Sequence, residues 1–159
     1  MEINYLKRLG NYPSIDEKKS DYINSLKPLP ELEIVNLEKI YNNGETFPKA
    51  LKELLHLAGS ACYLLEYGLS NTREEMQEDA REWLKRYDRS ITRPFFVIDV
   101  FNGGDQFLFV YLDDGNDPVV YEAVLYDKTP LWVHSLLDRK LSEFLDGRLN
   151  IILAGDNPF

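Results

Sequence analysis

The sequence has few histidine and cysteine side chains for catalysis or metal binding, and they are scattered. The only histidines are His56 and His134, and the only cysteine is Cys62. A metal site normally needs three or four converging ligands, so the two histidines are expected to have structural or surface roles. Cys62 lies between Ala61 and Tyr63 in an apolar stretch. Burial there would raise the pKa of its thiol, so we interpret Cys62 as a buried residue and not as a nucleophile.

Two polar turns resemble ligand-binding loops only in part. Residues 102–105, Asn-Gly-Gly-Asp, share their glycines with phosphate-binding loops but lie between two expected strands, which favours a hairpin turn. Residues 113–117, Asp-Asp-Gly-Asn-Asp, could supply oxygen ligands to calcium. The twelfth position counted from Asp113 is Val124 and not the glutamate that an EF-hand loop requires. We therefore expect no metal, no cofactor and no catalytic residue.

The apolar spacing predicts four helices that would position these groups. They cover residues 30–41, 48–58, 72–89 and 135–149, with Thr46 as a cap for the second. In the last helix, Leu137, Leu141, Phe144 and Leu145 are expected to face the core. Residues 61–67 fit either a strand or a helix.

Three segments rich in Phe, Val, Ile and Tyr predict strands over residues 94–101, 106–112 and 118–126. The turns between them predict an antiparallel meander, and the middle strand is apolar on both faces. The expected fold class is α+β, with an antiparallel or mixed sheet flanked by helices. We expect one domain over residues 31–159, preceded by a loosely docked leader over residues 1–30.

Composition excludes several classes of partner. The chain has 159 residues and a net charge of −9 at pH 7, the wrong sign for binding nucleic acid or anionic lipid. The apolar stretches are too short to span a membrane. The single cysteine and the absence of a secretory signal at the first residues predict a cytoplasmic protein.

The charge is unevenly distributed. Residues 94–127 contain seven acidic residues and neither lysine nor arginine, whereas the rest of the chain has 20 acids and 18 bases. These acids could simply supply turn residues and protect strand edges. Alternatively, unneutralised carboxylates on the hairpin tips would attract a basic partner.

Several segments occur in an order typical of a known family. They are the helix that carries Glu38, Phe47-Pro48 with the following leucines and Gly59, the glycine turn at 102–105, the Pro-Val strand at 118–121, and the closing segment 141–145. Over residues 31–149 this order resembles the SMI1/KNR4 (SUKH) superfamily, best known for bacterial immunity proteins. Ala58-Gly59 departs from the usual Asn-Gly, and the helix over residues 72–89 is longer than the usual connection.

This resemblance implies an α+β fold without catalytic residues and an intracellular protein that neutralises a cognate toxin, often a nuclease. Together with the charge pattern, it predicts a basic toxin domain as the partner. The candidate contact residues are Asp105, Asp113, Asp114, Asp117 and Glu122. Two alternatives remain open: a regulatory or scaffolding protein-interaction module, and a hydrolase that uses two carboxylates. The oligomeric state is not predicted.

Overall fold

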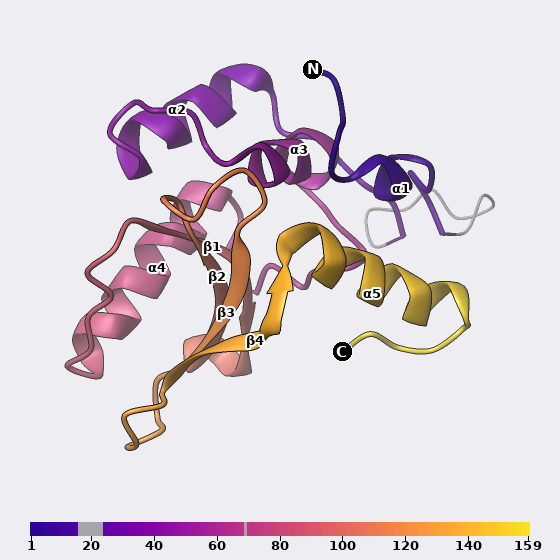
Figure 1. Ribbon diagram of the computed structural model, residues 1–159. Helices are drawn as coiled ribbons and strands as arrows, with labels where there is room; N and C mark the ends of the chain where they lie inside the picture. The colour runs from indigo at the N-terminus through magenta and orange to yellow at the C-terminus, as the bar shows by residue number, and fades with distance from the viewer. Residues whose placement is uncertain (16–23, 69) are drawn as a thin grey trace.

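The chain folds as an α+β domain built around one antiparallel sheet of four strands (Figure 1). The computed structural model describes residues 1–15, 24–68 and 70–159. The strands follow one another in chain order and pair as β1-β2-β3-β4. The elements are α1 (Lys7–Gly10), α2 (Glu31–Tyr41), α3 (Lys49–Ala58), α4 (Arg73–Arg86), β1 (Phe95–Phe101), a short 3-10 helix η1 (Asn102–Gly104), β2 (Gln106–Tyr111), β3 (Val119–Val124), β4 (Val133–Lys140) and α5 (Leu141–Leu153).

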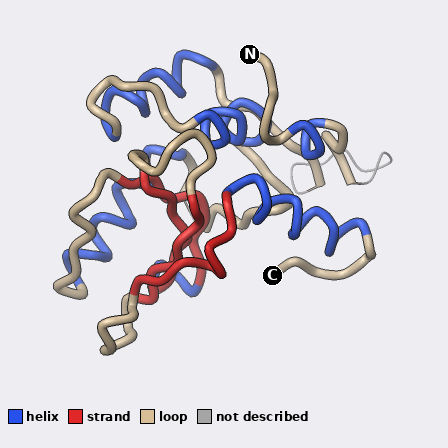
Figure 2. The backbone as a smooth tube through the Cα atoms, in the orientation of Figure 1, coloured by secondary structure: helices blue, strands red, loops and turns tan. Residues whose placement is uncertain are grey.

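The predicted three-strand meander and its covered middle strand are confirmed. Phe107, Leu108, Phe109 and Val110 of β2 are all buried, so both faces of the strand are packed. Helix α4 lies beside β1, and α5 lies at the other side of the sheet next to β4 (Figures 1 and 2). The sheet is therefore flanked by helices, as its apolar faces require.

The expected helix over residues 135–149 is wrong in its first six positions. These positions belong to β4, which pairs with β3, and Leu137 is 81% exposed instead of facing the core. Leu137 and Asp138 have φ values of +57° and +54°, which interrupt regular structure there. Helix α5 begins only at Leu141, where the Glu143 carboxylate accepts a hydrogen bond from the Lys140 N–H. Pairing with a neighbouring strand overrides the local helical pattern.

The other three expected helices match α2, α3 and α4 closely, whereas the short helix α1 was not predicted. Thr46 does not cap α3, because Pro48 occupies the N-cap position. In α4, Met76, Ala80 and Leu84 are buried and Trp83 is partly buried, as is Tyr87 at the C-cap. Residues 61–67 form neither helix nor strand, and Ala61 only bridges to Lys27.

Gln77 of α4 covers the outer edge of β1. It is fully buried, its Nε2 donates to the Val97 carbonyl at 2.8 Å, and its Oε1 accepts from the Val97 N–H at 2.8 Å. Arg81 Nη2 donates to the Phe95 carbonyl two residues earlier at 3.2 Å. Polar side chains of α4 thus satisfy backbone groups that a fifth strand would otherwise pair.

The described part of the N-terminal segment packs into the core. Leu6 and Leu9 are buried, and the buried Glu53 carboxylate accepts the backbone N–H groups of Asn4, Tyr5 and Leu6 at 2.8 Å each. The division of the chain at residue 30 stays a prediction, since residues 16–23 lie outside the described residues. Among the helices that are described, none has the length and apolar character needed to cross a membrane.

Candidate functional site

The five carboxylates predicted to contact a partner do not form one surface. Asp105 and Glu122 lie toward the turn between β1 and β2, whereas Asp113, Asp114 and Asp117 lie in the turn between β2 and β3. Successive turns of a meander are at opposite ends of its strands. A strand of six residues separates them by about 20 Å.

The three carboxylates of the β2–β3 turn are engaged within the fold. Asp113 pairs with Arg93 at 2.6 Å, and this guanidinium lowers the pKa of the Asp113 carboxyl. Asp114 accepts the Val119 N–H at 3.0 Å. Asp117 accepts the N–H of Ser142 at 3.1 Å and its hydroxyl at 2.6 Å, which ties the turn to the start of α5.

The other two carboxylates also have partners. Asp105 accepts a hydrogen bond from the Tyr87 hydroxyl at 2.7 Å. Glu122 accepts one from the Gln106 amide and lies 3.0 Å from His134 Nε2. Among the described residues, Arg93 neutralises Asp113, whereas Asp105, Asp114 and Asp117 are hydrogen-bonded by uncharged groups and keep their negative charge. Whether these five residues contact another protein stays a prediction.

Helix α4 carries an acidic surface that lies outside the acidic segment of residues 94–127. Its members, called here the α4 acidic face, are exposed or half-buried and lie at i, i+4 spacings: Glu74, Glu75, Glu78, Asp79 and Glu82. The helix also contains Arg73 and Arg81, but both fold against the protein. The Arg73 guanidinium lies 3.5 Å from the centre of the Tyr67 ring, and Arg81 donates to the carbonyls of Gln77 and Phe95.

The inward arginines change the charge that α4 presents to solvent. Because Arg73 and Arg81 are turned to the core, the exposed bases of the helix are Lys85 and Arg86, both in its last turn. The first three turns are left predominantly negative. The i, i+4 spacing of the acids is visible in the sequence. The orientation of the two arginine side chains depends on their contacts with Tyr67, Tyr41 and Phe95.

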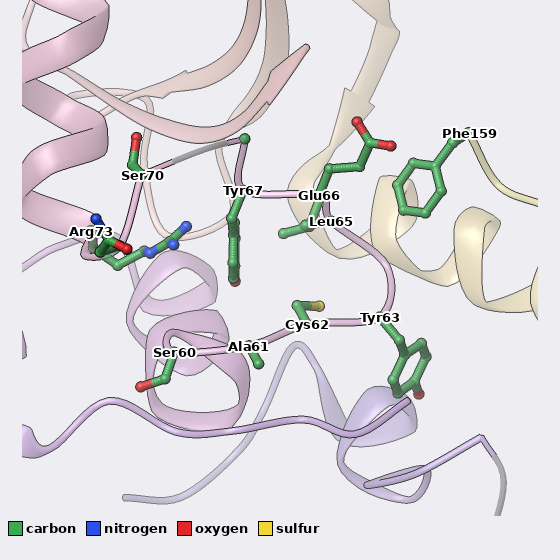
Figure 3. Close-up of a pocket in the computed structure, with 12 residues that line it drawn as sticks. Ser60, Ala61, Cys62, Tyr63, Leu65, Glu66, Tyr67, Ser70, Arg73 and Phe159 are labelled. Carbon is green, nitrogen blue, oxygen red and sulfur yellow. The ribbon is translucent and has the colours of Figure 1, made fainter. Parts of the chain in front are cut away.

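Two adjacent cavities open beside α4. The larger, of about 570 Å³, is lined by most residues from Ser60 to Gly68 together with Ser70, Asn71, Arg73 and Phe159. Figure 3 shows Glu66 and Phe159 at one end of this lining and Arg73 beside Tyr67 at the other. The second cavity, of about 420 Å³, lies between α4 and the β1–β2 turn and shares Glu66, Gly68 and Ser70 with the first.

A buried ion pair between Asp99 and Arg148 stabilises the segment that separates the sheet from these cavities. Asp99 of β1 is fully buried, and its Oδ1 accepts the N–H groups of Glu66 and Tyr67 at 2.9 Å. Arg148 of α5 donates to Asp99 Oδ2 at 3.1 Å and to the Leu64 carbonyl at 2.6 Å. Burial raises the pKa of Asp99 to about 6, although Arg148 and the N–H donors oppose the rise. The segment 64–67 is thus fastened from both sides.

Cys62 is buried, as the sequence predicted, and burial raises the pKa of its thiol to about 12. At pH 8 we expect the thiolate to be about a thousandfold less populated than in an exposed cysteine, since the ordinary pKa is about 8.5. A disulfide reagent such as DTNB should therefore leave the native protein unmodified and react with one thiol after urea is added. Rapid labelling with unchanged tryptophan fluorescence would contradict this assignment.

The histidines are not gathered with other ligands. His56 is half-exposed on α3, and His134 is exposed beside Glu122. Within residues 1–15, 24–68 and 70–159, no group of three or more His, Cys, Asp or Glu side chains is placed to hold a metal ion.

Comparisons with known proteins give no further support for the family resemblance. No family model, no curated protein and no solved structure matches the chain. The α+β class is the one that the SMI1/KNR4 resemblance implies, but unrelated families share this class. Membership of that superfamily therefore stays a prediction based on the order of its sequence segments.

Proposed function

We propose that this chain is a non-enzymatic protein-binding domain of the immunity type, which binds and neutralises a basic toxin domain. The observation that carries the proposal is the α4 acidic face. It presents five carboxylates while the arginines of the same turns are folded inward. The order of SMI1/KNR4-like segments supports the neutralising role, because the resembled family is known for it.

The chemistry of a nuclease partner suits such a surface. An enzyme that cleaves nucleic acid must present cations to phosphate groups. A carboxylate surface of matching shape would occupy those cations and would speed the encounter, by about 10-fold to 1,000-fold at low ionic strength. Salt would weaken this attraction, since the Debye length is about 8 Å at physiological ionic strength.

The position of the proposed contact differs from the one expected from sequence alone. The hairpin carboxylates support turns and cap elements, as Asp117 does for Ser142 and Asp114 for Val119. The carboxylates of Glu74, Glu78 and Glu82 on α4 are exposed, and none of them forms an ion pair within the described residues. They can meet a partner without dismantling the fold.

The prediction for this surface is a loss of binding upon charge reversal. The chain would be coexpressed and purified with the product of the gene adjacent to its own. The variant E74K/E78K/E82K should lower the association rate by about 10-fold to 100-fold at low salt, because steering then opposes the partner. Growth protection against that product should fall in parallel, and stopped-flow mixing measures the rate.

A matched variant separates position from net charge. E2K/E33K/E45K makes the same change in charge at exposed glutamates outside α4, and it should change the association rate by less than about threefold. If both variants bind alike, or if D113K/D114K/D117K alone abolishes binding while folded, the α4 acidic face is not the contact surface. A complex with a product that is not toxic would favour the scaffolding alternative.

A hydrolase with two carboxylates fits the cavities less well. Glu66 is exposed and Asp79 is half-buried, so neither carboxylate is enclosed away from bulk water, as catalysis by such a pair would require. The two carboxylates lie beside aromatic rings, an arrangement that suits binding of a cation better than acid catalysis.

A further inference from the structure

We propose that the cavity of about 420 Å³ between α4 and the β1–β2 turn, called here the anchor cavity, takes an arginine side chain of the basic partner. This inference rests on the proposed function and specifies the partner group that would enter the fold. The cavity volume lies in the range of roughly 300–1,000 Å³ that is typical of binding pockets. Its lining combines carboxylate, aromatic and amide groups: Asp79, Trp83, Phe101 and Asn102, with Glu66 on the wall shared with the larger cavity.

Trp83 is held in place by the glycine turn. A Cβ atom on Gly104 would lie 2.3 Å from Cε2 of the indole, so the ring packs directly on the backbone of this residue. Gly104 also has a φ of +101°, a conformation that other residues rarely adopt. The indole is thus a fixed wall of the anchor cavity, and binding there would cost little side-chain entropy.

Asp79 supplies the negative charge inside the cavity. It is half-buried, and the Ser70 hydroxyl donates to its Oδ2 at 2.9 Å. This hydrogen bond orients the carboxylate and occupies only one of its acceptor positions. Among the residues that the structure describes, no lysine, arginine or histidine forms an ion pair with Asp79.

The lining favours arginine over other groups. A guanidinium is planar, stacks on aromatic faces and donates up to five hydrogen bonds, which suits an indole, a phenyl ring and a carboxylate together. A neutral group of the same shape would lose the charge-assisted bond to Asp79. The α4 acidic face runs into this cavity through Asp79, so a basic partner attracted by the face would be led to the anchor cavity.

The test uses a short blocked peptide, acetyl-Gly-Arg-Gly-amide, titrated into the ¹⁵N-labelled protein. The chain has two tryptophans, so the indole N–H signals of Trp83 and Trp132 can be assigned with the variants W83F and W132F. We expect the Trp83 signal to move and saturate. The same peptide with citrulline should bind about tenfold more weakly, since one charge-assisted hydrogen bond is lost.

Matched variants make the test specific. D79N keeps the shape of the side chain and an oxygen for Ser70, and it should weaken the arginine peptide about tenfold. E33Q removes one exposed charge on α2 and should leave the affinity within about twofold. The proposal is overturned if citrulline binds as well as arginine, if D79N binds like the unmodified protein, or if the Trp83 signal does not move.

Failure of this inference and failure of the proposed function give different results. If the adjacent gene product binds the chain and D79N leaves that affinity unchanged, the anchor cavity is unused and the protein-binding function stands. If the arginine peptide saturates Trp83 but the adjacent gene product does not bind, the cavity recognises arginine and the toxin-neutralising function is wrong.

Discussion

Replacement of Arg148 by methionine is expected to lower the free energy of unfolding by about 3 kcal/mol at neutral pH, because it leaves a buried carboxylate without its cation. Asp99 is fully buried, and Arg148 supplies its only ion pair within the described residues. The change also removes the hydrogen bond to the Leu64 carbonyl, and the segment 64–67 should loosen. Urea unfolding followed by tryptophan fluorescence measures the loss.

The pH dependence of the free energy of unfolding provides a second test of the R148M variant. The pKa of Asp99 is raised to about 6, above the value of about 3.9 in an unfolded chain. The native state therefore takes up the proton first, and the contribution of Asp99 to stability rises as the pH falls through this window. Without Arg148 the pKa should rise further, so the deficit of R148M should shrink from about pH 8 to about pH 5.

A control variant and a double variant test this interpretation. R86M removes an exposed arginine of α4 and should cost less than about 0.5 kcal/mol. The double variant D99N/R148M should be less destabilised than the sum of its single changes, because neither charge is then left buried alone. An additive double variant, or a deficit that grows as the pH falls, would contradict the ion-pair account.

Replacement of Glu53 by alanine is expected to cost about 3 kcal/mol and to release the N-terminal segment. Three backbone N–H groups, those of residues 4–6, donate to this one buried carboxylate, and an unsatisfied buried donor costs about 1–3 kcal/mol. Detachment of residues 1–10 would hydrate these donors, at the expense of the burial of Leu6 and Leu9. Because the segment can detach instead, the loss of stability in E53A cannot exceed the free energy needed to detach it.

Hydrogen exchange and limited proteolysis distinguish the two results. In E53A, amides of residues 4–9 should exchange faster, and protease should cut near Lys7 and Arg8 before the sheet is attacked. E45A changes an exposed glutamate next to α3 and should leave both measurements unchanged. If the N-terminal segment stays protected in E53A, the carboxylate is not what fastens it.

The sequence predicted much of the fold because local signals were strong there. The meander follows from aromatic strands separated by glycine and aspartate turns, and α2 and α3 follow from apolar spacing with proline entries. Leu137, Leu141 and Leu145 repeat every four residues, which predicts a helix where the structure has the second half of strand β4. Its true structure depends on pairing with β3, which local periodicity does not report.

The candidate site was harder to predict, since charge in a sequence says nothing about where the partners of that charge lie. Asp113 is neutralised by Arg93, which is 20 residues away and just outside the acidic segment. Asp117 is tied to Ser142, which lies 25 residues further along the chain at the start of α5. Conversely, the sequence of α4 contains both acids and bases, and only its contacts show that Arg73 and Arg81 are turned inward.

The two edges of the sheet have a consequence for how the protein behaves when it is crowded. An open strand edge is a template on which a second molecule can build a cross-β fibril. Here the Gln77 amide pairs with the backbone in the middle of the β1 edge. At the other edge, the left-handed backbone conformations of Leu137 and Asp138 interrupt the regular geometry of β4. A hydrophobic residue at position 77 would leave the N–H and carbonyl of Val97 without their partners at this edge, and we expect such a variant to form insoluble aggregates more readily.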